Sequence, residues 1–124
     1  MKVLALDYGS ARTGIAVSDP TGTLARPVGV AAKVGTPAGL EGLLRTIGEE
    51  EPEQVVVGLP LTLRGEEGEQ ARETLGFVEM LRGAIDIPVV TYDERFTSSL
   101  ADGDDARAAA YILSSYLEWL ARGT

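Results

Sequence analysis

The segment Gln54–Leu59 constrains the fold most strongly, because it contains three consecutive valines with no polar residue between them. A strand with one solvated face alternates polar and apolar residues, whereas a strand buried on both faces reads as a continuous apolar run. Strands of the second kind belong to sheets whose two faces are covered by helices. The segment therefore predicts an α/β fold with this strand inside the sheet.

The rest of the chain supplies partners for this strand. Apolar runs predict four more strands, over Val3–Leu6, Thr13–Ser18, Arg26–Ala32 and Ile87–Tyr92. Helices are expected after Thr36-Pro37, from the acidic stretch at 66–69, and from Asp105 onward. This order, three antiparallel-type strands and then helix, strand, helix, strand and helix, predicts a mixed five-stranded sheet flanked by helices, in one domain over residues 1–124.

The composition excludes several kinds of chemistry. The chain has no cysteine and no histidine, which rules out Ser-His-Asp and Cys-His catalysis and a zinc site of thiolates and imidazoles. The net charge of −8 argues against indiscriminate nucleic-acid binding, although nine of the eleven cations are arginines, which suit phosphate contacts. With neither a signal-peptide core nor a bilayer-spanning run in the sequence, we expect a cytoplasmic protein.

Three carboxylates stand at positions that suggest a site: Asp7 after the first strand, Glu94 after the fifth, and Asp105 in the first turn of the last helix. Helical steps from Asp105 lead along an apolar stripe, so its side chain is expected to face inward and to need a partner. A divalent cation would satisfy all three groups. Oxygen-only ligands favour Mg²⁺ or Mn²⁺, which support phosphodiester hydrolysis.

Each carboxylate also has an ordinary interpretation. Asp7 could form a turn after a strand. Glu94 could be a surface carboxylate paired with Arg95 or Arg12. Asp105 could compensate the dipole of the helix that it begins.

Four blocks, in order, resemble the YqgF or RuvX family of RNase H-like nucleases, known as pre-16S rRNA nucleases or Holliday junction resolvases. The resemblance covers nearly the whole chain. The blocks are Leu6-Asp7-Tyr8-Gly9 with Arg12–Asp19, Val57–Leu61 with Gly65 and Glu67-Gly68, Tyr92–Ser98, and Asp105-Ala106 with Ala108–Ala110, Ile112-Leu113 and Tyr116-Leu117.

The resemblance implies an RNase H-like fold and a divalent-metal-dependent endonuclease that processes the 5′ end of pre-16S rRNA. Resolution of Holliday junctions in branched DNA is the alternative, and the protein would be a monomer or a homodimer. The implied catalytic and metal-binding residues are Asp7, Glu94 and Asp105, with Mg²⁺ or Mn²⁺ as cofactor. The implied substrate-binding residues are Arg12, Arg64, Arg95 and Thr97.

Two features depart from the family pattern. Thr62 stands where the family usually has asparagine, which would alter a substrate hydrogen bond. The stretch Thr97–Asp104 is shorter than usual and has no cation. A basic nucleic-acid-binding loop is therefore either lost in this member or missing from the sequence, and we favour the second.

Two other classes of function compete with a nuclease. The Asp-x-Gly turn after the first strand also suits the phosphate loop of an actin-like or sugar-kinase-like nucleotide-binding module, of which this chain holds one half. A catalytically idle protein that binds the ribosome or a polymerase is the other alternative. Loss of cleavage in an Asp7→Asn variant that still folds would distinguish a nuclease from both.

Overall fold

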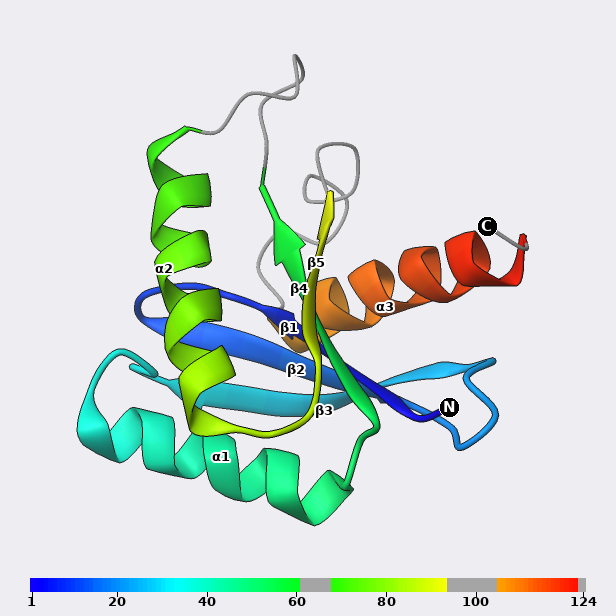
Figure 1. Cartoon of the computed structure of the whole chain (residues 1–124), viewed down its shortest axis with the longest axis horizontal. Helices are drawn as coiled ribbons and strands as arrows, with labels where there is room; N and C mark the ends of the chain where they lie inside the picture. Colours follow the sequence, from blue (N-terminus) through cyan, green and yellow to red (C-terminus); the bar gives the residue numbers. More distant parts are fainter. Residues whose placement is uncertain (61–67, 94–104, 123–124) are drawn as a thin grey trace.

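The computed structural model describes residues 1–60, 68–93 and 105–122. Within these ranges the chain forms five strands and three helices in the predicted order, and none of the helices has the length and apolar character needed to cross a membrane (Figure 1). The elements are β1 (Val3–Asp7), β2 (Arg12–Ser18), β3 (Ala25–Ala32), α1 (Pro37–Glu50), β4 (Gln54–Leu59), α2 (Glu69–Ala84), β5 (Val89–Asp93) and α3 (Asp105–Ala121).

The strands form one mixed sheet in the order β3-β2-β1-β4-β5, which confirms the predicted architecture. β2 is antiparallel to both β1 and β3, whereas β4 is parallel to both β1 and β5. Consequently β1, β3, β4 and β5 all end at the same edge of the sheet. We call this edge, which holds Asp7, Ala32, Leu59 and Asp93, the carboxyl edge.

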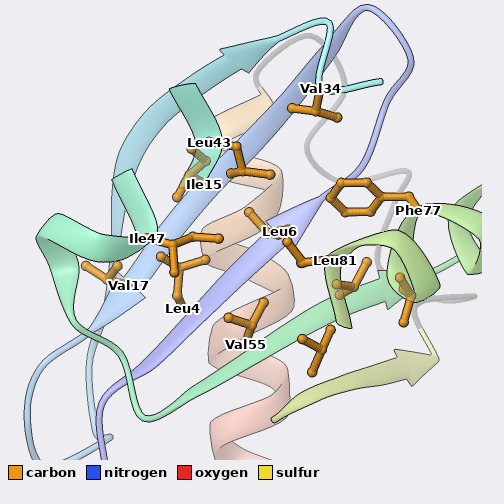
Figure 2. Packing of buried hydrophobic residues seen from close by; sticks show 13 residues of the cluster. Leu4, Leu6, Ile15, Val17, Val34, Leu43, Ile47, Val55, Phe77 and Leu81 are labelled. Atoms are coloured by element: carbon orange, nitrogen blue, oxygen red, sulfur yellow. The ribbon is translucent and has the colours of Figure 1, made fainter. Parts of the chain in front are cut away.

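One face of the sheet is covered by α1 and α2. Figure 2 shows side chains of β1, β2 and β4 directed at residues of the two helices, with Val34 closing one end of the cluster. Complete burial of such a side chain contributes roughly 1.5–3 kcal/mol, so this layer accounts for much of the stability of the sheet. The fully buried members include Leu4, Leu6, Val17, Val34, Leu43, Val55, Val57 and Leu81.

The other face is covered by α3. Alanines at positions 5, 16 and 109 let the helix backbone approach the sheet closely, and larger side chains fill the space on either side. The apolar stripe predicted along the last helix, from Ala109 to Leu120, is confirmed as far as Leu117, whereas Leu120 is only partly buried. Its buried members are Ala109, Ile112, Leu113, Tyr116 and Leu117.

Two element details differ from the sequence prediction. β5 begins at Val89 and not at Ile87, because Pro88 has no N–H to donate to the ladder; its carbonyl accepts from the Val55 N–H at 2.9 Å. In α2 the helical spacing of Ala71, Leu75, Val78 and Leu81 or Arg82 predicts an apolar stripe, but the buried face includes Thr74 while Leu75 is only partly buried. The Thr74 hydroxyl donates to the Gln70 carbonyl at 2.9 Å, which satisfies the buried oxygen.

Candidate active site

Asp7 is the last residue of β1, the central strand of the sheet. Because side chains alternate along a strand, Asp7 shares the face of Val3 and Ala5, which pack under α3. Its neighbour in the β2 register is Gly14, which has no side chain to fill the adjacent space. A half-buried carboxylate therefore stands at the carboxyl edge of the sheet.

The course of α3 brings Asp105 toward the same place. Near its C-terminal end, Leu117 and Leu120 line a surface pocket of about 300 Å³ together with Met1 and Val3, at the beginning of β1. Asp105 precedes Leu117 by twelve residues, so it lies roughly 18 Å back along the helix axis, toward the end of β1. The start of α3 and the end of β1 thus approach each other on one face.

β5 is tied to α3 near the carboxyl edge. The hydroxyls of Tyr92 and Ser115 are 2.8 Å apart, and the Tyr92 ring meets the Tyr116 ring edge-on with centroids 5.5 Å apart. Tyr92 is the penultimate residue of β5 and stands two positions before Glu94. The strand that leads to Glu94 is therefore held against the helix that begins with Asp105.

The turn between β1 and β2 keeps Arg12 at this edge. Thr13 is fully buried, and its hydroxyl donates to the Gly9 carbonyl at 3.3 Å. A side chain at Gly9 would bring its Cβ within 2.5 Å of the Arg12 carbonyl, so the turn requires glycine there. The only sign of this role of Thr13 in the sequence is its position four residues after Gly9.

The structure describes only part of the predicted set of metal ligands. Among residues 1–60, 68–93 and 105–122, no three carboxylates gather into a cluster. Glu94 lies outside these ranges, as do Arg64, Arg95, Thr97 and the short stretch up to Asp104, and Asp105 contributes only its backbone. Of the three predicted ligands, the structure therefore describes the side chain of Asp7 alone, and its carboxylate oxygens are of the kind that Mg²⁺ or Mn²⁺ prefers.

Comparison with known proteins connects this arrangement to a family. Residues 1–119 match the model of the RuvX family, described as Holliday junction resolvase. Two bacterial relatives are provisionally named pre-16S rRNA nucleases. The protein from Sulfurihydrogenibium is 41% identical over 96% of this chain and 91% of its own length, and the protein from Rubrobacter xylanophilus is 43% identical over 94% and 92%.

The alignment with the Sulfurihydrogenibium protein has 134 positions, more than the 124 residues of this chain, so that relative carries residues without a counterpart here. Among solved structures, Thermus thermophilus RuvC in complex with a Holliday junction substrate matches with a TM-score of 0.64 and 19% identity, over 100% of this chain and 97% of that one. This likeness confirms the RNase H-like fold. The chain belongs to the RuvX family.

Proposed function

We propose that this protein is a divalent-metal-dependent endonuclease that processes the 5′ end of pre-16S ribosomal RNA in the cytoplasm. The names of its relatives support this substrate. The observation that carries the proposal is the course of α3, which runs back along β1 and brings the start of the helix to the end of that strand. In the proposal this course brings the carboxylates of Asp7 and Asp105 together at the carboxyl edge.

In this proposal Asp7, Glu94 and Asp105 hold Mg²⁺ or Mn²⁺. Cations held there would supply activation of a water molecule and stabilisation of the leaving oxygen of a phosphodiester. The chain itself contributes fixed geometry, because Asp7 stands on the central strand and α3 is packed across the sheet. No nucleophilic side chain is needed.

The cationic side chains have a different task. Arg12 is exposed at the start of β2, two residues before Gly14, which is the register partner of Asp7. In the proposal Arg12, Arg64 and Arg95 contact phosphates, and Thr97 contacts the substrate through its hydroxyl. Such contacts are needed because the whole chain carries a charge of −8, which repels a polyanion.

Holliday junction resolution is the second candidate. The description of the family and the fold shared with junction-bound RuvC favour it. A resolvase makes two symmetric cuts and therefore requires a two-fold dimer. Sedimentation of the protein with and without a four-way junction would measure this, and a protein that stays monomeric on the junction contradicts resolution.

The test compares three proteins: wild type, Asp7→Asn and Asp86→Asn. Asp86 is exposed in the connection between α2 and β5, away from the carboxyl edge, so it controls for the loss of one negative charge. Each protein is incubated with precursor rRNA and with a synthetic four-way junction, in Mn²⁺, in Mg²⁺ and in EDTA. Circular dichroism establishes that both variants fold.

We expect cleavage by the wild type and by Asp86→Asn, and none in EDTA. Asp7→Asn should lose at least about 100-fold in rate, because the substitution keeps the size of the side chain and removes a ligand charge. The preferred substrate decides between the two candidates. Full activity of Asp7→Asn, or cleavage in EDTA, would show that the proposed site is wrong.

A further inference from the structure

The turn that follows β3 holds Lys33 in a fixed backbone position. The Lys33 N–H donates to the Ala11 carbonyl at 3.0 Å, which joins this turn to the β1–β2 turn. The Lys33 carbonyl accepts from both the N–H and the hydroxyl of Thr36, at 2.9 and 2.7 Å. Figure 1 shows the two turns side by side at the left of the molecule. Hydrogen bonds of its N–H and carbonyl groups thus fix the backbone position of Lys33.

The backbone of Lys33 has a conformation that favours glycine. Its φ is 48°, and Glu51 at 52° is the only other described non-glycine residue with a positive φ. Glu51 is explained by its place as the C-cap of α1. Glycine would adopt the φ of Lys33 with less strain. We therefore infer that the lysine side chain has a function at this position.

The side chain of Lys33 is exposed and makes no ion pair with any residue in the described part of the chain. It is one of only two lysines, the other being Lys2, which pairs with Glu50 at 3.2 Å. The first turn of α1, which follows directly, has no acidic residue. Among the described residues, the ammonium group of Lys33 therefore has no ionic partner that would explain its presence.

Its position relative to Asp7 follows from the strand registers. Asp7 pairs with Gly14, and Gly14 pairs with Val30, so β3 is displaced from Asp7 by roughly 10 Å across the sheet. Lys33 lies three residues beyond Val30, roughly 10 Å further along the strand direction. The two displacements combine to about 14 Å, which corresponds to about four phosphate steps of a nucleic-acid strand at about 3.4 Å of axial rise each.

A second cation stands beside Lys33. Arg12 pairs in register with Ala32, the residue before Lys33, and its side chain is also exposed. Both residues belong to the carboxyl edge, on the side away from β4 and β5. Two cationic residues thus have neighbouring backbone positions in a protein whose net charge is −8.

We propose that Lys33 forms, with Arg12, a phosphate-binding pair that holds the sugar-phosphate backbone of the substrate on the β2–β3 side of the active site. The inference rests on the proposed nuclease function, which places a nucleic-acid strand at Asp7. It specifies the path of the bound strand, which leaves the active site across the turns that follow β1 and β3. The ligand is the phosphodiester backbone, which RNA and DNA share.

The experiment measures binding without cleavage. Fluorescence anisotropy of a labelled 24-nucleotide single-stranded RNA and of a labelled four-way DNA junction is followed over a range of salt concentrations. All variants are made in the Asp7→Asn background, and they are Lys33→Gly, Lys33→Arg, Glu51→Gly and Arg45→Ala. Glu51→Gly relieves a positive φ elsewhere, and Arg45→Ala removes an exposed α1 cation that pairs with Glu41.

We expect Lys33→Gly to weaken binding about five- to tenfold at low salt, and to reduce the slope of log K against log salt by about 0.7–0.9, the value for one lost phosphate contact. Lys33→Arg should bind as its parent does. Both glycine variants should melt at the parent temperature or above it, because each relieves a positive φ. The nucleic acid whose binding is weakened more by Lys33→Gly, RNA or the DNA junction, is the one whose backbone the pair contacts.

Unchanged affinity and slope in Lys33→Gly would overturn the inference, and so would an equal loss in Arg45→Ala, which would indicate a general effect of charge. The cleavage assay with Asp7 intact separates this outcome from failure of the proposed function. If the wild type cleaves and Lys33→Gly binds as its parent does, the proposed nuclease function is retained and the phosphate-binding pair is rejected. If Lys33→Gly weakens binding but the protein with Asp7 intact does not cleave, the phosphate-binding pair is retained and the nuclease function is rejected.

Discussion

The ring of Tyr8 stacks on the ring of Phe77, with centroids 4.6 Å apart and planes inclined by 23°. Tyr8 follows Asp7 directly, and it contacts α2 while Asp7 faces α3. Burial raises the pKa of the Tyr8 hydroxyl, and the nearby Glu73 carboxylate, its hydrogen-bond partner, raises it further. The end of β1 is therefore held from the α2 side next to the proposed metal ligand.

Removal of this ring should loosen the carboxyl edge. We expect Tyr8→Ala to lower the free energy of unfolding by about 2 kcal/mol, because the stacked contact is lost. Tyr8→Phe keeps the stack and should cost less than about 1 kcal/mol. Urea denaturation measures both, with Tyr111→Ala as a control at an exposed α3 position. Equal losses in Tyr8→Ala and Tyr111→Ala would contradict the importance of the stack.

Two glycines of α1 should respond to alanine in opposite directions. A Cβ at Gly39 would lie 1.9 Å from the Lys33 carbonyl oxygen, whereas a Cβ at Gly48 meets nothing within 4 Å. Gly48→Ala should stabilise the protein by about 0.5–1 kcal/mol through helix propensity. Gly39→Ala should destabilise it by about 1–3 kcal/mol and displace the Lys33 turn. Thermal melts check both signs, and a stabilising Gly39→Ala would disprove the close contact.

The buried hydroxyl of Ser18 satisfies a backbone group of the central strand. It accepts from the Val3 N–H at 2.8 Å and donates to the Asp19 carbonyl at 2.9 Å. Ser18→Ala leaves the Val3 N–H without this partner and should cost about 1–3 kcal/mol. Ser114→Ala, at an exposed α3 position, serves as the control and should be within about 0.5 kcal/mol of the wild type. Chemical denaturation that gives both variants the same stability would refute this prediction.

The turn between β2 and β3 should be sensitive to acid. The Asp19 carboxylate accepts from the Thr21 hydroxyl and from the N–H groups of Thr23 and Leu24, which lower its pKa from 3.8 to about 2. A lowered pKa contributes stability that is present above pH 3.8 and is lost as the pH falls toward 2. The stability difference between wild type and Asp19→Asn should therefore shrink over this range.

Denaturation at a series of pH values measures this difference. Asp86→Asn is the control for the loss of one surface charge. A wild-type advantage over Asp19→Asn that stays the same from pH 5 to about pH 2 would show that the carboxylate is not stabilised in the folded turn.

The sheet and its helices were predictable because their signals are local. Val55–Val57 form a buried strand, and the apolar stripe of α3 runs from Ala109 to Leu117, as their patterns indicated. The start of β5 was misplaced because Pro88 lies inside an apolar run, and only the missing N–H separates it from the ladder.

The surroundings of the site were less predictable because they depend on contacts between distant residues. Nothing near Tyr8 in the sequence points to Phe77, and nothing near Lys33 points to the hydrogen bond with Ala11. Asp7 was found because its residue type is unusual at the end of a buried strand. The roles of all seven site residues stay predictions, namely those of Asp7, Arg12, Arg64, Glu94, Arg95, Thr97 and Asp105.

In the described part of the chain, α3 alone shields the face of Val3, Ala5, Ala16 and Val56. Among the described elements, α3 follows every strand of the sheet in the chain. A sheet that forms without α3 therefore exposes this apolar strip to water. Docking of α3 covers the strip and also positions the backbone of Asp105, so in the proposed enzyme the completion of folding and catalytic competence coincide.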